Sequence, residues 1–148
     1  MKTFYFAYGS NINQKQMADR CPGSEIGPLA RLSGWRYFIN GRGYAGVEEC
    51  PSNQVLGCLW SLREDHIKAL DRYEGVSGNY YSKETLEVEQ LVDGAKVSAL
   101  VYLSVNREYG IPSLRYQGVV VSGAHEVGLP TVYLTMLESW ANGCPADA

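Results

Sequence analysis

The sequence predicts an α+β domain in which a mostly antiparallel β-sheet, able to close into a small mixed barrel, is flanked by helices. Runs of high strand propensity, rich in aromatic and β-branched residues, recur as far as Ser104. Helical apolar spacing dominates only after Pro112. With 148 residues, the chain has the length of one ordinary domain, so we expect residues 1–148 to form a single domain.

The N-terminal elements follow from aromatic runs and one capping pattern. Residues 3–8 form the first expected strand, because Phe and Tyr dominate the run and a glycine ends it. Asn13 with Gln16 three residues later has the pattern of a capping box and predicts a short helix. Residues 30–40 are the second expected strand.

The middle of the chain predicts a strand followed by a helix. Residues 51–53, Pro-Ser-Asn, read as a turn before a strand at residues 55–62. Ser61 with Glu64 repeats the capping-box pattern and predicts a helix over residues 63–73.

A β-hairpin and two helices are expected next. Residues 80–91 and 96–104 are strand-like and are joined by a turn containing Asp-Gly, a strong hairpin signal. Ser113 is the expected cap of one helix, and Thr131 is the expected cap of a second after Gly128-Leu129-Pro130.

Composition excludes several classes of partner. A net charge of −3 and a pI near 5.4 leave no basic surface for nucleic acid. No apolar run approaches the roughly 20 residues that cross a bilayer, so we expect no membrane association and a cytoplasmic location. The four cysteines lack metal-site spacing and are expected to be reduced thiols, so we predict neither a metal nor a cofactor.

Two sequence features suggest functional sites but lack the surrounding sequence that such sites require. The pattern Gly41-x-Gly43-x-x-Gly46 resembles a dinucleotide fingerprint, but no helical run follows it, so these are expected to be flexible loop glycines. Ser10 is not expected to be a Ser-His-Asp nucleophile, because no G-x-S-x-G elbow surrounds it. His66 is expected on the polar side of its helix and His125 at a helix end.

Two stretches could carry chemistry. Tyr8-Gly9-Ser10-Asn11 is either an ordinary capped turn or a turn whose N–H groups hold a carboxylate or oxyanion. Glu74 follows a helix end, where an acidic side chain is unfavourable. It is either a solvated partner of Arg72 or Lys83, or a proton carrier whose pKa is raised by burial.

Three ordered motifs resemble the γ-glutamylcyclotransferase family, in its γ-glutamyl-amino-acid branch within the AIG2-like superfamily. They are YFAYGSN at the start, LDRYEGVSGNYY in the middle and YQGVVVSGAHEVGLP near the end. The resemblance spans residues 4–140. It implies a small mixed β-barrel flanked by helices and, without any cofactor, a lyase-type intramolecular acyl transfer. A γ-glutamyl substrate would be cyclised to 5-oxoproline with release of an amino acid or amine.

The resemblance also implies roles for individual residues. Glu74 matches the catalytic acid/base, and the expected substrate-binding residues are Tyr8, Gly9, Ser10, Asn11, Tyr80 and Tyr116. Asn11 stands where glutathione-specific relatives usually have leucine, which favours γ-glutamyl amino acids over glutathione. Residues 40–51 follow the family loosely and could line the site.

Some alternatives stay open from the sequence. The same residues could remove a γ-glutamyl protecting group in a biosynthetic pathway, or the domain could be a binding protein without activity. The expected partner is a small γ-glutamyl molecule, and the sequence leaves a homodimer open.

Overall fold

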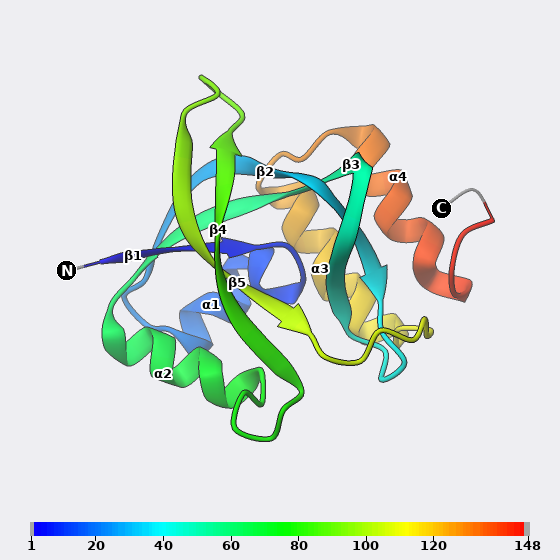
Figure 1. Cartoon of the computed structure of the whole chain (residues 1–148), viewed down its shortest axis with the longest axis horizontal. Helices are drawn as coiled ribbons and strands as arrows, with labels where there is room; N and C mark the ends of the chain where they lie inside the picture. The colour runs from blue at the N-terminus through cyan, green and yellow to red at the C-terminus, as the bar shows by residue number, and fades with distance from the viewer. Residues whose placement is uncertain (1, 147–148) are drawn as a thin grey trace.

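A closed barrel forms the centre of the molecule (Figure 1). The computed structural model describes residues 2–146; residues 1 and 147–148, the ends of the expected single domain, lie outside the described residues. The strands, within the described part, are β1 (Thr3–Ala7), β2 (Glu25–Ile39), β3 (Ala45–Leu62), β4 (Tyr81–Gln90) and β5 (Lys96–Ser104). They are ordered β1-β3-β2-β4-β5. Only the closing pair β1 and β5 is parallel among these neighbours. The expected small mixed barrel is confirmed.

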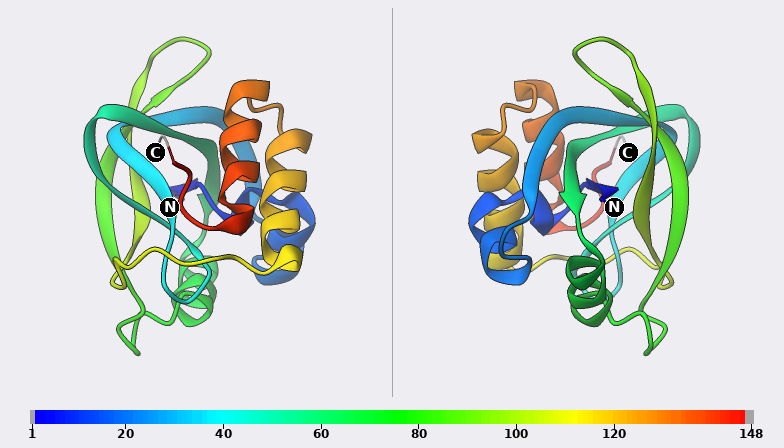
Figure 2. Two further views of the ribbon diagram at one scale, coloured as in Figure 1. Left: turned by 90° about the vertical axis from the view of Figure 1, so that its right-hand side faces the viewer. Right: turned by 90° about the vertical axis from the view of Figure 1, so that its left-hand side faces the viewer.

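Helices cover one flank and one end of the barrel. Figure 2 shows α3 and α4 side by side on one flank, with the β4–β5 hairpin on the opposite flank. The helices are η1 (Ser10–Ile12), α1 (Gln14–Arg20), α2 (Glu64–Tyr73), α3 (Leu114–Glu126), α4 (Thr131–Ser139) and η2 (Trp140–Asn142). No helix among residues 2–146 has the length and apolar character needed to cross a bilayer.

Local signals placed several elements correctly. The β4–β5 hairpin is antiparallel over its whole length, and its turn contains Gly94 at φ +71°. The Asn13 side chain accepts a hydrogen bond from the Gln16 amide at the start of α1. Ser113 likewise caps α3 by accepting from the Tyr116 amide at 3.0 Å. These elements formed as expected because each depends on contacts within a few residues.

The predicted turn at residues 51–53 is wrong, because these residues lie within β3. The pairing of β2 with β3 shifts register between Ser33 and Trp35, so the Pro-Ser-Asn segment bulges out opposite Gly34. Pro51 is exposed in this bulge. Since the bulged segment forms no pairs with β2, the N–H that proline lacks costs no hydrogen bond there. Long-range pairing therefore continues the strand through a local turn signal.

The expected cap of α2 is also wrong. Its N-cap is Arg63 rather than Ser61, and the His66 ring accepts the Arg63 amide at 3.1 Å. His66 is 2% exposed and its Nε2 meets the Pro22 carbonyl at 2.7 Å, so it does not lie on a polar face. Its two hydrogen bonds make this buried position favourable.

Two smaller differences concern residues near turns. Pro130 occupies the N-cap position of α4, and Thr131 is the first helical residue. Gly46 is not a loop glycine but part of β3, where a Cβ would lie 2.8 Å from Cβ of Ser104. Close packing inside the barrel, rather than flexibility, explains the glycine at that position.

Candidate active site

A cavity of about 220 Å³ opens at the end of the barrel where β1 meets η1. The turn between β2 and β3 and the C-terminal end of α2 form other parts of its wall. The lining residues come from segments far apart in the sequence: Tyr5, Tyr8, Gly9, Ser10, Asn11, Arg20, Arg42, Tyr44, Ala45, Tyr73, Glu74, Gly75, Tyr81, Tyr102 and Tyr116. The fold thus brings the two stretches singled out in the sequence to one site.

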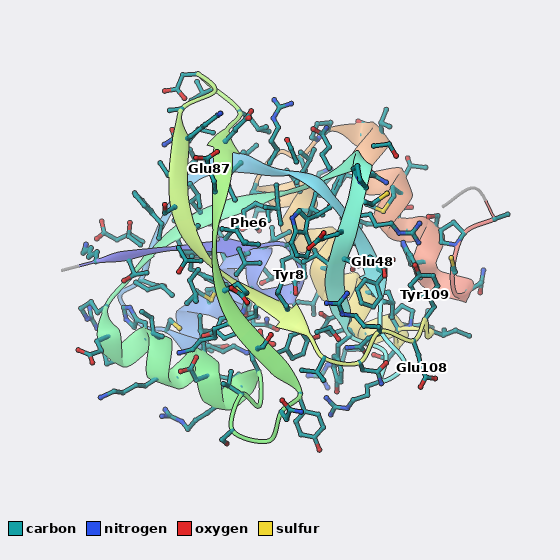
Figure 3. The ribbon with its side chains drawn as sticks, viewed as in Figure 1. Phe6, Tyr8, Glu48, Glu87, Glu108 and Tyr109 are labelled. Atoms are coloured by element: carbon teal, nitrogen blue, oxygen red, sulfur yellow. The ribbon has the colours of Figure 1, made fainter. Side chains whose placement is uncertain are left out.

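Strand β1 contributes Tyr5 to this cavity, and the residues that directly follow the strand, Tyr8 and Gly9, also line it. Tyr8, which Figure 3 labels, is buried, and its hydroxyl donates to the Tyr102 carbonyl at 2.6 Å. Gly9 follows, where a Cβ would lie 3.0 Å from Cβ of Ala45 and 3.2 Å from the Tyr116 hydroxyl. A larger residue at position 9 would therefore push Tyr116 and the β2–β3 turn apart.

The turn after Gly9 is held rigidly by side chains. Gln16 donates to Ser10 Oγ at 2.7 Å and to Asn11 Oδ1 at 2.9 Å. It therefore holds this turn instead of completing the capping box expected with Asn13. Ser10 and Asn11 begin η1, whose first backbone bond runs from Ile12 N to Gly9 O. The N–H groups of Ser10 and Asn11 thus precede the first intrahelical bond.

The Asn11 side chain is committed to internal contacts. Its Nδ2 donates to the Tyr5 hydroxyl at 2.9 Å, and its Oδ1 also accepts from Arg20 at 3.1 Å. The residue is 3% exposed. The side-chain amide therefore fixes the shape of the turn and the position of Arg20. Because the Asn11 carbonyl accepts from the Trp60 indole at 3.0 Å, the backbone N–H is the part of Asn11 that remains available to a ligand.

Among residues 2–146, Glu74 is the only carboxyl group that lines the cavity. It is partly buried at the C-cap of α2, where its amide donates to the Leu70 carbonyl at 2.8 Å. Burial raises the pKa of this carboxyl group from 4.5 to about 7, and the positive charge of Arg20 opposes the shift. Lys83 pairs with Asp71 at 2.8 Å rather than with Glu74. Glu74 can therefore gain or lose a proton near neutral pH.

Tyrosine side chains surround Glu74 and stay neutral. The Tyr81 hydroxyl donates to the Ala45 carbonyl at 2.6 Å, and the Tyr102 hydroxyl donates to Asp71 at 2.7 Å. Burial raises the pKa of both hydroxyls above the usual range. They shape the cavity without competing with Glu74 for protons near neutrality.

Tyr116 and Tyr80 occupy different places. The Tyr116 hydroxyl lines the cavity and accepts from the Ala45 amide at 3.1 Å, and burial raises its pKa to about 12. Tyr80 is 49% exposed and lies at the rim, outside the lining, whereas its neighbour Tyr81 lies in the lining. Both predicted tyrosines are thus near the site, but only one faces the cavity.

The sequence did not single out several residues of the wall. Arg20, Arg42 and Tyr44 line the cavity, and residues 42–45 belong to the segment whose contribution was left open. No local pattern marks an arginine that reaches a cavity through folding of a distant turn. Among residues 2–146, no three His, Cys, Asp or Glu side chains gather in a way that could hold a metal ion.

Comparison with known proteins gives consistent results. The sequence profile of the AIG2-like family matches residues 54–137. Human γ-glutamylcyclotransferase is 32% identical over 146 residues, covering 91% of this chain and 77% of the human protein. The bovine γ-glutamylcyclotransferase is 33% identical with the same coverage. A solved structure of a γ-glutamyl cyclotransferase superposes with a TM-score of 0.88 at 27% identity, covering 100% of this chain and 91% of that chain.

Proposed function

The chain belongs to the AIG2-like family of γ-glutamylcyclotransferases, and we propose that it converts γ-glutamyl amino acids or amines to 5-oxoproline and the free amino acid or amine. One observation carries the proposal: Glu74, the only carboxyl group of the described chain in the cavity, has a pKa of about 7 and shares the cavity with the Gly9-Ser10 turn. A binding protein without activity has little use for such a poised acid/base.

The γ-glutamyl group is proposed to bind against the turn of residues 8–11. The backbone N–H groups of Ser10 and Asn11 are suited to an oxygen anion, because they precede the first hydrogen bond of η1. Tyr116 closes this side through its contact with the Ala45 amide. Holding the substrate folded brings its α-amine close to its own γ-carbonyl, which accelerates cyclisation.

Glu74 is proposed to move the protons. The substrate reacts with its α-amine in the free form. As this nitrogen attacks the γ-carbonyl carbon, Glu74 as a carboxylate takes one proton from it. The ring C–N bond forms, the original amide C–N bond breaks, and Glu74 returns a proton to the leaving nitrogen. A pKa near 7 lets one group perform both transfers at neutral pH. The four cysteines are free thiols, which fits our proposal that the enzyme works in the reducing cytoplasm.

The test is a substrate panel with product identification. The purified protein, incubated with γ-glutamyl-alanine and related γ-glutamyl compounds, is expected to release 5-oxoproline. Glu74→Gln keeps the side-chain shape but removes the acid/base, so it should lower kcat by at least about 100-fold. Glu84→Gln, an exposed position on β4, is the matched control. An inactive wild-type protein across the panel, or an active Glu74→Gln variant, would contradict the proposal.

A further inference from the structure

Arg42 is a cavity-lining cation without an ion-pair partner among residues 2–146. None of the ion pairs or side-chain hydrogen bonds within residues 2–146 uses its guanidinium group, although it lines the cavity. Arg36, on the neighbouring strand, shows the usual alternative: it pairs with Glu48 at 3.1 Å and donates to Tyr109 at 2.9 Å (Figure 3 labels both partners). An unpaired guanidinium facing a cavity is available to a ligand.

The buried side chain of Asn40 fixes the backbone that carries Arg42. Asn40 is 1% exposed, and its Oδ1 accepts from the amides of Arg42 at 2.9 Å and Tyr44 at 3.1 Å. Its Nδ2 donates to Ser104 Oγ at 3.0 Å, at the end of β5. Gly43 takes φ +89°, which completes the turn. The turn therefore holds Arg42 at a defined place on the rim.

Two aromatic rings orient the guanidinium group. Its carbon lies 4.0 Å from the centre of the Tyr80 ring and 5.4 Å from the centre of the Tyr44 ring. Tyr44 in turn packs edge to face on Tyr116, with ring centres 5.2 Å apart. Tyr80 packs over Gly75, where a Cβ would lie 2.7 Å from its ring. A continuous chain of contacts thus joins Arg42 to Tyr116 on one side and to the residue after Glu74 on the other.

The cavity has a buried inner end and an exposed rim. Tyr5, Tyr8 and Tyr102 are no more than 6% exposed, whereas Tyr44 is 42% exposed. A γ-glutamyl group held at the inner turn therefore directs its leaving amine toward the rim. Arg20 already donates to Asn11. Of the two cations that line the cavity within the described residues, Arg42 is therefore the one available for that outer group.

We propose that Arg42 is a specificity-determining residue that binds a carboxylate on the leaving amine, so that γ-glutamyl amino acids and peptides are preferred over neutral γ-glutamyl amines. The inference rests on the proposed function. Guanidinium groups bind carboxylates through two parallel hydrogen bonds, and the aromatic rings keep the planar group oriented for this contact. Tyr80 and Tyr44 act as positioning residues for Arg42.

The test uses two substrates that differ only in one carboxylate, γ-glutamyl-alanine and γ-glutamyl-ethylamine. The wild-type kcat/KM should favour γ-glutamyl-alanine by roughly 10- to 100-fold, as expected for hydrogen bonds to a charged group. Arg42→Gln should lower kcat/KM for γ-glutamyl-alanine to the level of the amine and change the amine by less than about threefold. Arg42→Lys should lie between, and the exposed Arg115→Gln should match the wild type.

The other outcomes distinguish the role of Arg42 in substrate specificity from the proposed cyclisation activity. Equal wild-type kcat/KM for both substrates, or an equal loss for both in Arg42→Gln, would overturn the role of Arg42 and leave the cyclisation intact. No turnover of either substrate by the wild type would overturn the proposed function and this inference with it. If Arg42→Gln does not fold, raising the salt concentration should slow only γ-glutamyl-alanine turnover by the wild type; an equal response of both substrates would overturn the inference.

Discussion

The environment of Glu74 determines what this carboxyl group can do. Its place at the end of α2 adds the negative end of the helix dipole to the effect of burial, and both disfavour the ionised form. Arg20, which Asn11 holds in place, is the charge that opposes this effect. The proton affinity of the site thus depends on a helix end, a buried wall and a cation from α1.

Turnover should depend on pH through the protonation state of Glu74. Because Glu74 must be ionised to accept a proton and its pKa is about 7, kcat/KM for γ-glutamyl-alanine should fall as the pH is lowered through 7. Arg20→Gln removes the opposing charge, so the acidic limb should move to higher pH, whereas Arg20→Lys should keep it near the wild-type position. An acidic limb below pH 5, unchanged in Arg20→Gln, would contradict this role of Glu74.

The carboxyl group of Glu74 should also make the free energy of unfolding depend on pH. Between pH 4.5 and about 7, the usual and folded pKa values of Glu74, the folded protein binds more protons at this site than the unfolded chain. The free energy of unfolding therefore decreases as the pH rises through this range. Glu74→Gln has no charge to bury, so it should be more stable than the wild type above pH 7, by up to about 3 kcal/mol.

Urea unfolding at pH 8 and pH 4 measures this difference. The gain of Glu74→Gln should be present at pH 8 and vanish at pH 4, where the carboxyl group is protonated in both states. The exposed Glu84→Gln is the control and should show no such pattern. A Glu74→Gln variant less stable than the wild type at pH 8 would indicate that the ionised carboxylate is satisfied in the folded protein.

Helix α3 supports the site from outside the barrel. It carries Tyr116 in its first turn, and it approaches the cap of α1 so closely that the side chain of Asn13 donates to the Val119 carbonyl at 3.2 Å. Gly123 permits this approach, because a Cβ there would lie 2.7 Å from the backbone N and Cα of Asn13. The position of the turn of residues 8–11 is therefore coupled to the packing of α3.

A pair of glycine substitutions in α3 tests this coupling. Gly123→Ala should force α3 away from Asn13, lower the free energy of unfolding by about 1–3 kcal/mol and reduce kcat/KM. Gly118→Ala, in the same helix with no atom within 4 Å of the added Cβ apart from its chain neighbours and the nearby backbone of α3, should instead stabilise the protein by up to about 1 kcal/mol. Denaturant midpoints and turnover of both variants give the comparison. Similar midpoints would show that α3 can retreat without affecting the turn.

Across the whole molecule, the elements that the sequence predicts correctly are those that depend on contacts between residues close in sequence. Helix caps at Asn13 and Ser113 and the Asp-Gly hairpin involve neighbours in sequence. The parallel closure of β1 on β5, which pairs Tyr5 with Leu100, connects strands at opposite ends of the sheet, so no local signal encodes it.

The candidate site shows the same limit. Family motifs pointed to Glu74 and the turn of residues 8–11, and the fold places them around one cavity. Arg42 and Tyr44 reach that cavity because β2 and β3 are long enough to carry the turn between them over the end of the barrel. The sequence does not predict this strand length, because Pro-Ser-Asn at residues 51–53 has the pattern of a turn. The wall of a cavity built by long-range pairing is thus the part that sequence patterns predict least.

A reaction in water labelled with ¹⁸O shows whether the substrate's own α-amine is the nucleophile. If the α-amine attacks the γ-carbonyl, γ-glutamyl-alanine should yield equal amounts of alanine and 5-oxoproline, with no ¹⁸O in the 5-oxoproline by mass spectrometry. If water is the nucleophile, the product is glutamate with ¹⁸O in its γ-carboxylate. Labelled glutamate as the main product would contradict the account, and unlabelled 5-oxoproline formed by the wild type but not by Glu74→Gln would support it.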